Sequence, residues 1–485
     1  MSQNAFMGFY FSPRGGSAQV ARYLSRALSG GPWAPTLFTG SLGAAGETSN
    51  AADFFRGVRC APLDYTPAAL SWAAGGDPMA TEVPMHASYE DKPGVPDRTF
   101  LHLDDAAYDR QVTSWARFLS EHTRVPPTVV HLHHLTPIHQ AVHALWPRVP
   151  VVTHLHGTEL KMLASVVDGT TLTGAAGVAH AWVARMRRWA AGSDRTVVVS
   201  AMDRELTLDL LPVAADRVVT IANGVDTGVF APIDSPPGDR LARWRHWLVD
   251  DPQGWRPGGA AGSIRYQPDD LAAFLDPDGK PVPVVLFAGR FMRFKRLQLL
   301  IEAHHAMRSA TGNRSVLVVV GGFPGEWEGE HPYETVCRLG ADGVFFIGWR
   351  DHTDLADILR CSDVFAAPAV DEPFGLVYLE AMSAGIPPIA TNTGGPLSFV
   401  NVDSSRPTGW LVPPDDVAAT AEALAAAVSC PEERRVRGRR AAGFVRRQYS
   451  WRSAAQAFER LYEEVVDERA PTTGLQLDRP SRGAA

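Results

Sequence analysis

The chain has 485 residues, of which 45% are hydrophobic and 20% are charged, and its formal net charge is −7. This length exceeds one ordinary hydrophobic core and predicts two domains of roughly 200 residues each. The negative charge argues against a general nucleic-acid binder. Four cysteines without C-x-x-C spacing, an N-terminus unlike a signal peptide, and no long apolar run predict a cytoplasmic protein without a membrane span. Membrane-surface contact and oligomeric state stay open.

The first half of the chain alternates short apolar runs with helical patterns, which is typical of a doubly wound α/β sheet. One helical pattern ends at Leu28, and a second covers residues 109–122. Residues 42–96 show little periodicity and predict loops and short strands. The predicted strands are residues 6–11, 128–133, 149–155, 196–200 and 217–221.

Two glycines, Gly15 and Gly16, follow the first predicted strand. Such a turn lets the backbone approach a phosphate or a sugar closely, although a lone pair of glycines is more often only a turn. The segment lacks the G-x-G-x-x-G fingerprint, and this argues against a nicotinamide oxidoreductase.

Histidines crowd the segment between residues 131 and 156, which raises the hypothesis of a metal site. The hypothesis is not favoured, because His131 and His133 alternate on a strand and no cysteine or acidic side chain supplies a convincing fourth ligand. We therefore expect no metal. The seven histidines are His131, His133, His134, His139, His143, His154 and His156.

Residues 181–189 form an apolar stripe opposite a row of arginines. The stripe consists of Trp182, Val183, Met186 and Trp189. A basic amphipathic helix of this kind can dock on an anionic membrane. A helix packed on the protein surface is the favoured interpretation.

Residues 235–283 are dense in proline, glycine and aspartate and are longer than an interdomain connection requires. Asp276 and Asp278 form a D-x-D sequence, a pattern that binds metal in other enzymes. Here Gly279 follows and no strand precedes, so a β-turn is favoured. The role of this insert stays open.

The second half again alternates strands and helices. At residues 289–295, Arg290 and Lys295 lie before an amphipathic helix, where both can converge on a diphosphate. Residues 434–447 hold seven arginines and predict a solvated helix. The predicted strands are residues 284–288, 315–320, 344–347, 364–367 and 388–390.

Residues 363–385 predict a strand, a loop and a helix start, around which the chain is organised. Glu372 precedes a proline and is expected in the loop, whereas Glu380 lies inside the helix. Free N–H groups at Gly375, Leu376 and Val377 would favour an anion beyond the strand's carboxyl end.

The segment EPFGLVYLEAM, residues 372–382, closely resembles the signature of glycosyltransferase family 4, the retaining, nucleotide-sugar-dependent enzymes with the GT-B fold. Further matches are the NGVD turn at residues 223–226, the G-R…K segment at 289–295 and the segment VVTHLHGTEL at 151–160. The resemblance covers nearly the whole chain except residues 235–283 and the tail.

The resemblance implies an α/β GT-B fold, in which two doubly wound Rossmann-like domains face each other across a cleft. Residues 1–230 would form the acceptor-binding domain, 231–283 a linker or insert, and 284–448 the nucleotide-sugar-binding domain. Residues 449–467 would form a helix that returns to the N-terminal domain, and 468–485 a disordered tail.

The implied activity is retaining transfer of a sugar from a nucleoside-diphosphate sugar, most simply UDP-linked, to a hydroxyl of a small-molecule, glycan or lipid acceptor. No cofactor or metal is expected. The alternative is a nucleotide-sugar epimerase with the same fold, which needs no acceptor.

The resemblance also implies roles for individual residues. Glu380 would bind the ribose, Glu372 would lie by the transferred sugar and the leaving phosphate, and His156 would lie beside the sugar or the acceptor, with His154 structural. The expected catalytic residues are His156, Arg290, Lys295 and Glu372. The expected donor-binding residues are Gly15, Gly16, Gly289, Gly375, Leu376, Val377 and Glu380.

Overall fold

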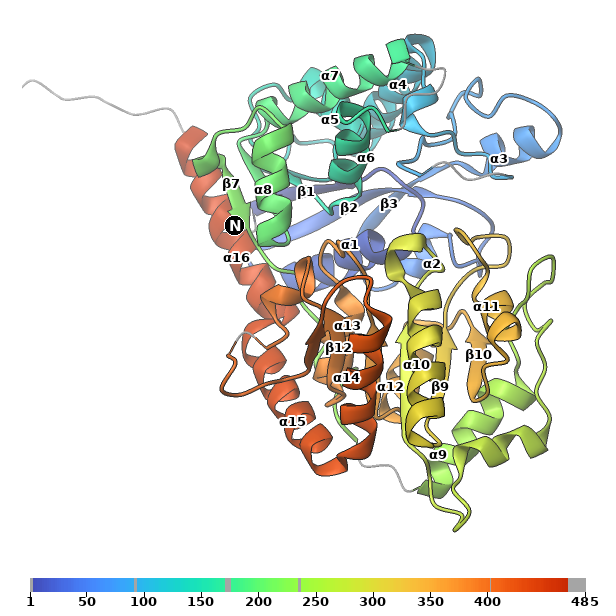
Figure 1. Ribbon diagram of the computed structural model, residues 1–485. Helices are drawn as coiled ribbons and strands as arrows, with labels where there is room; N and C mark the ends of the chain where they lie inside the picture. The colour runs from blue at the N-terminus through green and yellow to red at the C-terminus, as the bar shows by residue number, and fades with distance from the viewer. Residues whose placement is uncertain (1–2, 91–93, 171–175, 234–236, 402, 470–485) are drawn as a thin grey trace, which may run out of the picture.

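The computed structural model describes residues 3–90, 94–170, 176–233, 237–401 and 403–469. It contains two parallel β-sheets, each covered by helices on both faces (Figure 1). The N-terminal sheet has the strand order β3-β2-β1-β4-β5-β6-β7, and the C-terminal sheet has the order β10-β9-β8-β11-β12-β13. The predicted pair of doubly wound, Rossmann-like domains is confirmed.

The N-terminal domain contains the following elements: β1 Gln3–Phe9, α1 Gly15–Leu28, β2 Trp33–Ser41, α2 Ala51–Phe54, β3 Cys60–Asp64, α3 Thr66–Ala73, α4 Asp105–His122, β4 Val129–His133, α5 Ile138–Leu145, β5 Val151–His154, α6 Thr158–Val167, α7 Ala176–Gly192, β6 Arg195–Val198, α8 Ala201–Leu210 and β7 Val218–Thr220.

The C-terminal part of the chain contains the following elements: α9 Pro237–Arg245, β8 Val284–Ala288, α10 Leu297–Thr311, β9 Val316–Val320, α11 Pro332–Leu339, β10 Val344–Gly348, α12 His352–Arg360, β11 Val364–Ala367, α13 Leu376–Ser383, β12 Pro388–Thr391, β13 Trp410–Val412, α14 Val417–Ser429, α15 Pro431–Gln448 and α16 Trp451–Arg469.

Strand order reverses direction once in each sheet, between β1 and β4 and between β8 and β11. In open α/β sheets, ligands bind outside the carboxyl ends of the strands at this point of reversal. The loops after β1, β4, β8 and β11 are therefore the expected walls of a binding site.

The described part of the insert, residues 237–283, folds onto the C-terminal sheet. Trp244, Trp247 and Trp255 are buried in the core of that domain, and the indole N–H of Trp255 donates a hydrogen bond to the carbonyl of Gly322 at 3.2 Å. Residues 234–236 lie outside the described part of the chain. The insert thus supplies core residues to the C-terminal domain.

The D-x-D segment forms the expected turn. Asp276 Oδ1 accepts hydrogen bonds from the backbone N–H groups of Asp278 and Lys280, at 2.9 and 2.8 Å. The Gly279 N–H donates to the Asp276 carbonyl, which closes the turn.

The apolar stripe of α7 is buried within the N-terminal domain. Trp182 is 1% exposed and stacks on Phe100 with ring centroids 4.0 Å apart, and Met186 and Trp189 are also buried. The packed-helix interpretation is confirmed, and this stripe is not a membrane-docking surface. Among the helices that the structure describes, none is long and apolar enough to cross a membrane.

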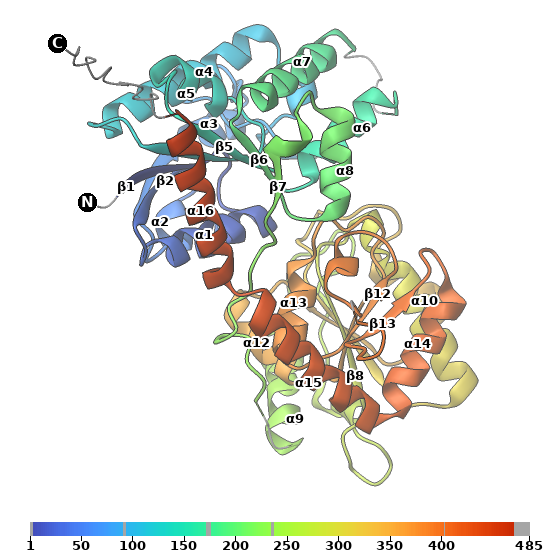
Figure 2. The same cartoon turned by 90° about the vertical axis from the view of Figure 1, so that its left-hand side faces the viewer.

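The last two helices pass from one domain to the other (Figure 2). Helix α15 packs against α13, whereas α16 packs against α1 and buries Phe458, Tyr462 and Val465 in the N-terminal core. Arg195 donates hydrogen bonds to Glu464 at 2.5 Å and to Glu468 at 2.5 and 3.0 Å. Helix α16 extends to Arg469, and the expected tail from residue 470 onward lies outside the described residues.

Candidate active site

The loops after β8 and β11 bring the expected diphosphate ligands together. The loop after β11 reverses at Gly375, whose φ of +92° is rare for other residues. A Cβ there would lie 2.7 Å from the Tyr378 ring and 3.2 Å from Glu372 Cγ. Helix α13 starts at the next residue, so the N–H groups of Leu376 and Val377 have no acceptor within the helix. Such a helix start favours an anion.

Arg290, which follows β8 and Gly289, is engaged by a residue of the opposite domain. Its guanidinium donates two hydrogen bonds to the carboxylate of Glu90, at 2.7 and 2.6 Å. Burial acts to lower the pKa of Arg290, but the hydrogen bonds and charge of Glu90 outweigh this effect and raise it. The guanidinium is therefore charged and already neutralised by Glu90.

Lys295 forms an ion pair with Glu372. Both side chains are largely buried, at 14% and 10% exposed, and a Cβ at Gly289 would lie 3.8 Å from Lys295 Cε. Across the domain boundary, the ammonium of Lys161 lies over the ring of Phe294, 4.2 Å from its centroid. Burial lowers the pKa of Lys161. These charges form one mixed cluster between the domains.

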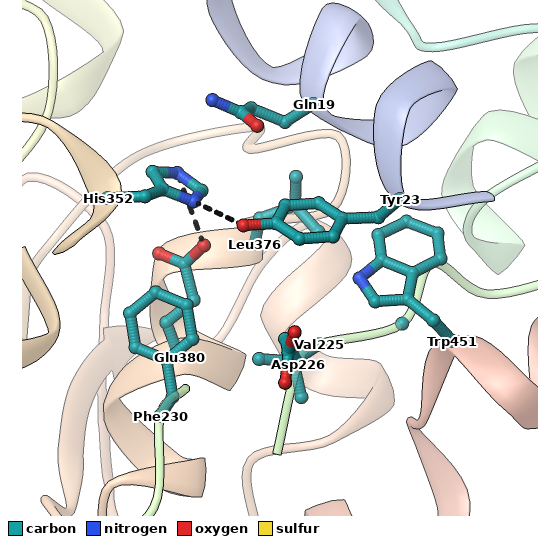
Figure 3. A pocket seen from close by; sticks show the side chains of 10 residues that line it. Gln19, Tyr23, Val225, Asp226, Phe230, His352, Leu376, Glu380 and Trp451 are labelled. Carbon is teal, nitrogen blue, oxygen red and sulfur yellow. Dashed lines mark hydrogen bonds and ion pairs between the residues drawn. The ribbon is translucent and has the colours of Figure 1, made fainter. Parts of the chain in front are cut away.

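Glu380 lies in a pocket between the domains that Leu376, the first residue of α13, also lines (Figure 3). His352 Nε2 lies 3.7 Å from Glu380 Oε1, and its Nδ1 is 3.2 Å from the hydroxyl of Tyr23 on α1. The Tyr23 ring stacks between His352 and Trp451, with centroids 6.0 and 5.8 Å away. Burial raises the pKa of Glu380, and His352 acts against this shift. The Glu380 carboxyl thus lies beside a stack of three aromatic rings.

His156 follows β5 and lies at the edge of the N-terminal domain. Its Nε2 is 2.9 Å from His133 Nδ1, and its backbone N–H donates to Glu159 at 3.0 Å. The next residue, Gly157, has φ +86°, and a Cβ there would lie 2.6 Å from Pro373 Cβ. Burial and the neighbouring histidines lower the pKa of His156 well below its usual value, so the imidazole is neutral.

The structure thus brings most of the sequence-predicted residues to one boundary. The His156 loop touches the loop that carries Glu372, and a Cβ at Gly16 would lie 4.0 Å from Leu376 of α13. Gly15 has φ +70° and opens α1. Glu380 lines the pocket beside Tyr23, and Leu376 lines the same pocket and connects it to this group.

Several residues at this boundary carried no signal in the sequence. Glu90 lies in a stretch without periodicity, and Tyr23 and His352 are 329 positions apart. Glu159 could have been found, because it follows the recognised His156 by one helical turn. Its contact with the backbone N–H of His156 is local, whereas its contact with His134 spans 25 positions.

Two family models match the chain. One described as Glycosyltransferase Family 4 matches residues 14–229, and one described as Glycosyl transferases group 1 matches residues 276–462. The chain belongs to glycosyltransferase family 4. Between them, the two matched segments include every expected site residue of this family 4 chain.

Among curated proteins, the chain is similar to enzymes named D-inositol 3-phosphate glycosyltransferase. It is 30% identical to that of Saccharomonospora viridis over 282 residues, which is 57% of each chain. It is also 30% identical to that of Kineococcus radiotolerans over 293 residues, which is 58% of this chain and 60% of the relative. The matches therefore span less than two thirds of these relatives.

Solved structures share the fold of this family 4 chain. Sucrose-phosphate synthase from Thermosynechococcus elongatus superposes with a TM-score of 0.63 at 19% identity, covering 96% of this chain and all of the other. Anabaena HepE, solved with UDP and glucose, superposes with a TM-score of 0.62 at 15% identity, covering 94% and 99%. Both structures share the two-domain architecture of this chain over nearly their whole length, and the predicted GT-B fold is confirmed.

Proposed function

We propose that this chain transfers a sugar from a nucleoside-diphosphate sugar, with UDP as the nucleotide, to a hydroxyl of an acceptor, with retention at the anomeric carbon. The observation that carries the proposal is the convergence of Arg290, Lys295 and the start of α13 at the point of strand reversal, opposite the His156 loop. In this arrangement the cations and the start of α13 would face the anionic leaving group, and the His156 loop would face the reacting sugar.

In this proposal, Arg290 and Lys295 stabilise the negative charge that develops on the leaving diphosphate. Breaking the bond between sugar and diphosphate places negative charge on the phosphate, and fixed donors aimed at that charge stabilise the transition state. Arg290 and Lys295 provide two positive charges, and the first turn of α13 provides N–H groups and its dipole. We therefore propose that transfer needs no metal ion.

The acidic residues have different roles in this proposal. Glu372 pairs with Lys295, and it is proposed to contact the transferred sugar when the donor separates the pair. Glu380, in the pocket with Tyr23 and His352, accepts hydrogen bonds from the ribose hydroxyls.

His156 is proposed to contact the transferred sugar or the acceptor. Its imidazole is neutral, and its loop reaches Pro373 beside Glu372. Retention is proposed to follow from attack on the face that the diphosphate leaves, with the departing phosphate taking the acceptor proton. The acceptor is a small molecule, glycan or lipid with a free hydroxyl. The names of the inositol phosphate relatives make a cyclitol phosphate the first candidate.

The test has two stages. A thermal-shift screen of nucleoside diphosphates should show the largest stabilisation with UDP, because a ligand that binds only the folded state raises stability by mass action. The purified chain is then incubated with UDP-sugars and an acceptor panel of cyclitol phosphates, free sugars and glycans. Mass spectrometry should detect a glycosylated acceptor. Release of a free sugar epimer without any acceptor would overturn the proposal.

A further inference from the structure

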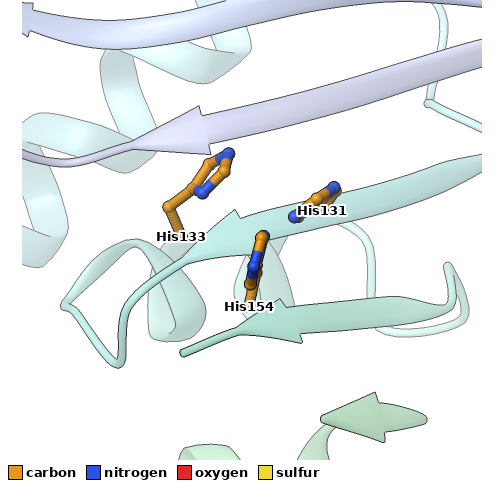
Figure 4. A group of neighbouring side chains, drawn as sticks. All are labelled: His131, His133 and His154. Atoms are coloured by element: carbon orange, nitrogen blue, oxygen red, sulfur yellow. The ribbon is translucent and has the colours of Figure 1, made fainter. Parts of the chain in front are cut away.

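Three buried histidines gather on one face of the N-terminal sheet (Figure 4). His131 and His133 are two residues apart on β4, and side chains at that spacing point to the same face of a strand. His154 is the register partner of His133 on the neighbouring strand β5. In the sequence, the alternate positions of His131 and His133 on a strand argued against a metal site. In the structure, this spacing places their two imidazoles side by side, and strand β5 adds the imidazole of His154.

The nitrogen atoms of these rings are arranged like those of metal ligands. His131 Nδ1 lies 2.6 Å from the Tyr462 hydroxyl, and His133 Nδ1 lies 2.9 Å from His156 Nε2. The opposite nitrogen of each ring, Nε2, and both nitrogens of His154 are buried without a hydrogen-bond partner among the described residues. A buried polar atom without a partner costs roughly 1–3 kcal/mol. Ligating histidines commonly have one nitrogen fixed by a neighbour while the other faces the metal.

We propose that His131, His133 and His154 bind one divalent transition-metal ion, zinc, beneath helix α16. One nitrogen from each residue lies within 4.8 Å of the other two. Zinc–nitrogen bonds of about 2.0–2.1 Å would draw these atoms closer together, which small rotations of the imidazoles can supply. Three imidazoles without a thiolate or carboxylate ligand suit zinc and leave a fourth position for water.

The surroundings of the three histidines favour the metal-binding form of each ring. All three rings are buried, at 0–1% exposed, and burial disfavours the charged imidazolium form. Neutral imidazole is the form that binds a metal. The neighbouring histidines have other partners, because the fully buried Glu159 side chain contacts His134 Nδ1 and accepts a hydrogen bond from the backbone N–H of His156.

The ion would stabilise the fold, and it would also hold the ring of His133, whose Nδ1 contacts the proposed catalytic residue His156. Tyr462 lies on α16, which packs on this face of the sheet, so the ion would tie the returning helix to β4 through His131. Arg290 and Lys295, the proposed phosphate ligands, lie in the other domain and contact none of the three histidines.

The experiment measures metal content in the full chain. Protein purified from zinc-supplemented cells should contain about one zinc per chain by mass spectrometry of the elements. Replacing zinc with Co²⁺ should give a visible absorption band, and X-ray absorption should show imidazole nitrogen neighbours around the metal. Added zinc should raise the melting temperature of metal-free protein by on the order of 5 °C.

Variants locate the ion. His131→Gln and His154→Gln should each lose the zinc and the melting shift, whereas His139→Gln should keep both, because His139 is a buried histidine that bonds Thr136 and Thr153 instead. Zinc retained in both triad variants would overturn the proposal. So would wild-type protein that binds neither zinc nor Co²⁺, or X-ray absorption without imidazole neighbours. The last two results need no variant and decide the matter even if the variants do not fold.

Discussion

Glu90 competes with the donor for Arg290 in this structure, and its replacement should strengthen nucleotide binding. The carboxylate of Glu90 occupies both outer nitrogens of the guanidinium, the atoms that the diphosphate would use. Binding of UDP therefore requires this pair to separate. Glu90→Gln removes the competing charge and leaves Arg290 in place, so the dissociation constant for UDP should fall.

The size of the effect follows from the exposure of the pair. Two charge-assisted hydrogen bonds in a dry site could contribute several kcal/mol. Arg290 and Glu90 are 36% and 25% exposed, however, so water screens the interaction and about 1 kcal/mol is a better value. Release of that energy corresponds to roughly fivefold tighter binding of UDP.

Isothermal calorimetry with UDP checks this prediction in a cycle of four proteins. Glu90→Gln should bind about fivefold more tightly, Arg290→Ala should bind more weakly than the wild type, and Glu90→Gln should add nothing in the Arg290→Ala background. The gain should also shrink at high salt. Weaker or unchanged binding by Glu90→Gln would refute the reasoning.

A second ion pair provides the matched control. Glu326 pairs with Arg14 across the same domain boundary, whereas the hydrogen bonds of Arg290 go to Glu90. If Glu326→Gln strengthened UDP binding as much as Glu90→Gln, the gain would come from looser domain contact and competition for Arg290 would be the wrong explanation.

Three further predictions concern the proposed site. Glu380→Ala should weaken UDP binding roughly ten- to a hundredfold by calorimetry, through loss of charge-assisted hydrogen bonds of about 1.5–3 kcal/mol; unchanged affinity would contradict the ribose assignment. His156→Ala should bind UDP almost normally yet lose most of its turnover, the pattern of a contact made chiefly in the transition state; full transfer activity would show that His156 has no such role. Brief exposure to EDTA should leave the rate of transfer unchanged, whereas loss of turnover that Mg²⁺ or Mn²⁺ restores would contradict leaving-group stabilisation by Arg290 and Lys295.

The sheets were predictable because interior parallel strands are buried on both faces. Such strands appear as continuous runs of β-branched and aromatic residues, as at Val284–Ala288, where all five residues are buried. Helix α3 was not predicted. Its residues Leu70 and Trp72 are exposed apolar side chains, so the helix lacks the periodic contrast between apolar and polar faces.

The insert shows where composition misleads. Its proline, glycine and aspartate content is typical of loops, yet it buries three tryptophans against the C-terminal sheet. Isolated large aromatic residues in an aperiodic segment give no local sign of which surface they cover. The three tryptophans pack on the C-terminal sheet, whose strands are distant from the insert in the sequence, so the local sequence does not reveal this contact.

The site was predictable where strands and helices begin and end. Arg290, Lys295, Glu372 and Gly375 each lie within a few residues of a strand end or a helix start, so local pattern places them. Their partners were not predictable, because Glu90 is 200 positions from Arg290. The sequence likewise predicted a structural role for His154 without indicating that register pairs it with His133.

The contacts between the domains define what donor entry must disrupt. Gly157 lies against Pro373, Lys161 lies over Phe294, and Glu90 holds Arg290, so the donor side of the boundary is closed by close packing and ion pairs. The two places where the chain crosses between domains lie together, since the N–H of Val225 donates to the Tyr449 carbonyl at 2.8 Å. Adjacent crossings allow the domains to rotate apart without unfolding either sheet. Opening then costs both the packing contacts and the ion pairs at the boundary, and a diphosphate that replaces Glu90 on Arg290 would offset part of that cost.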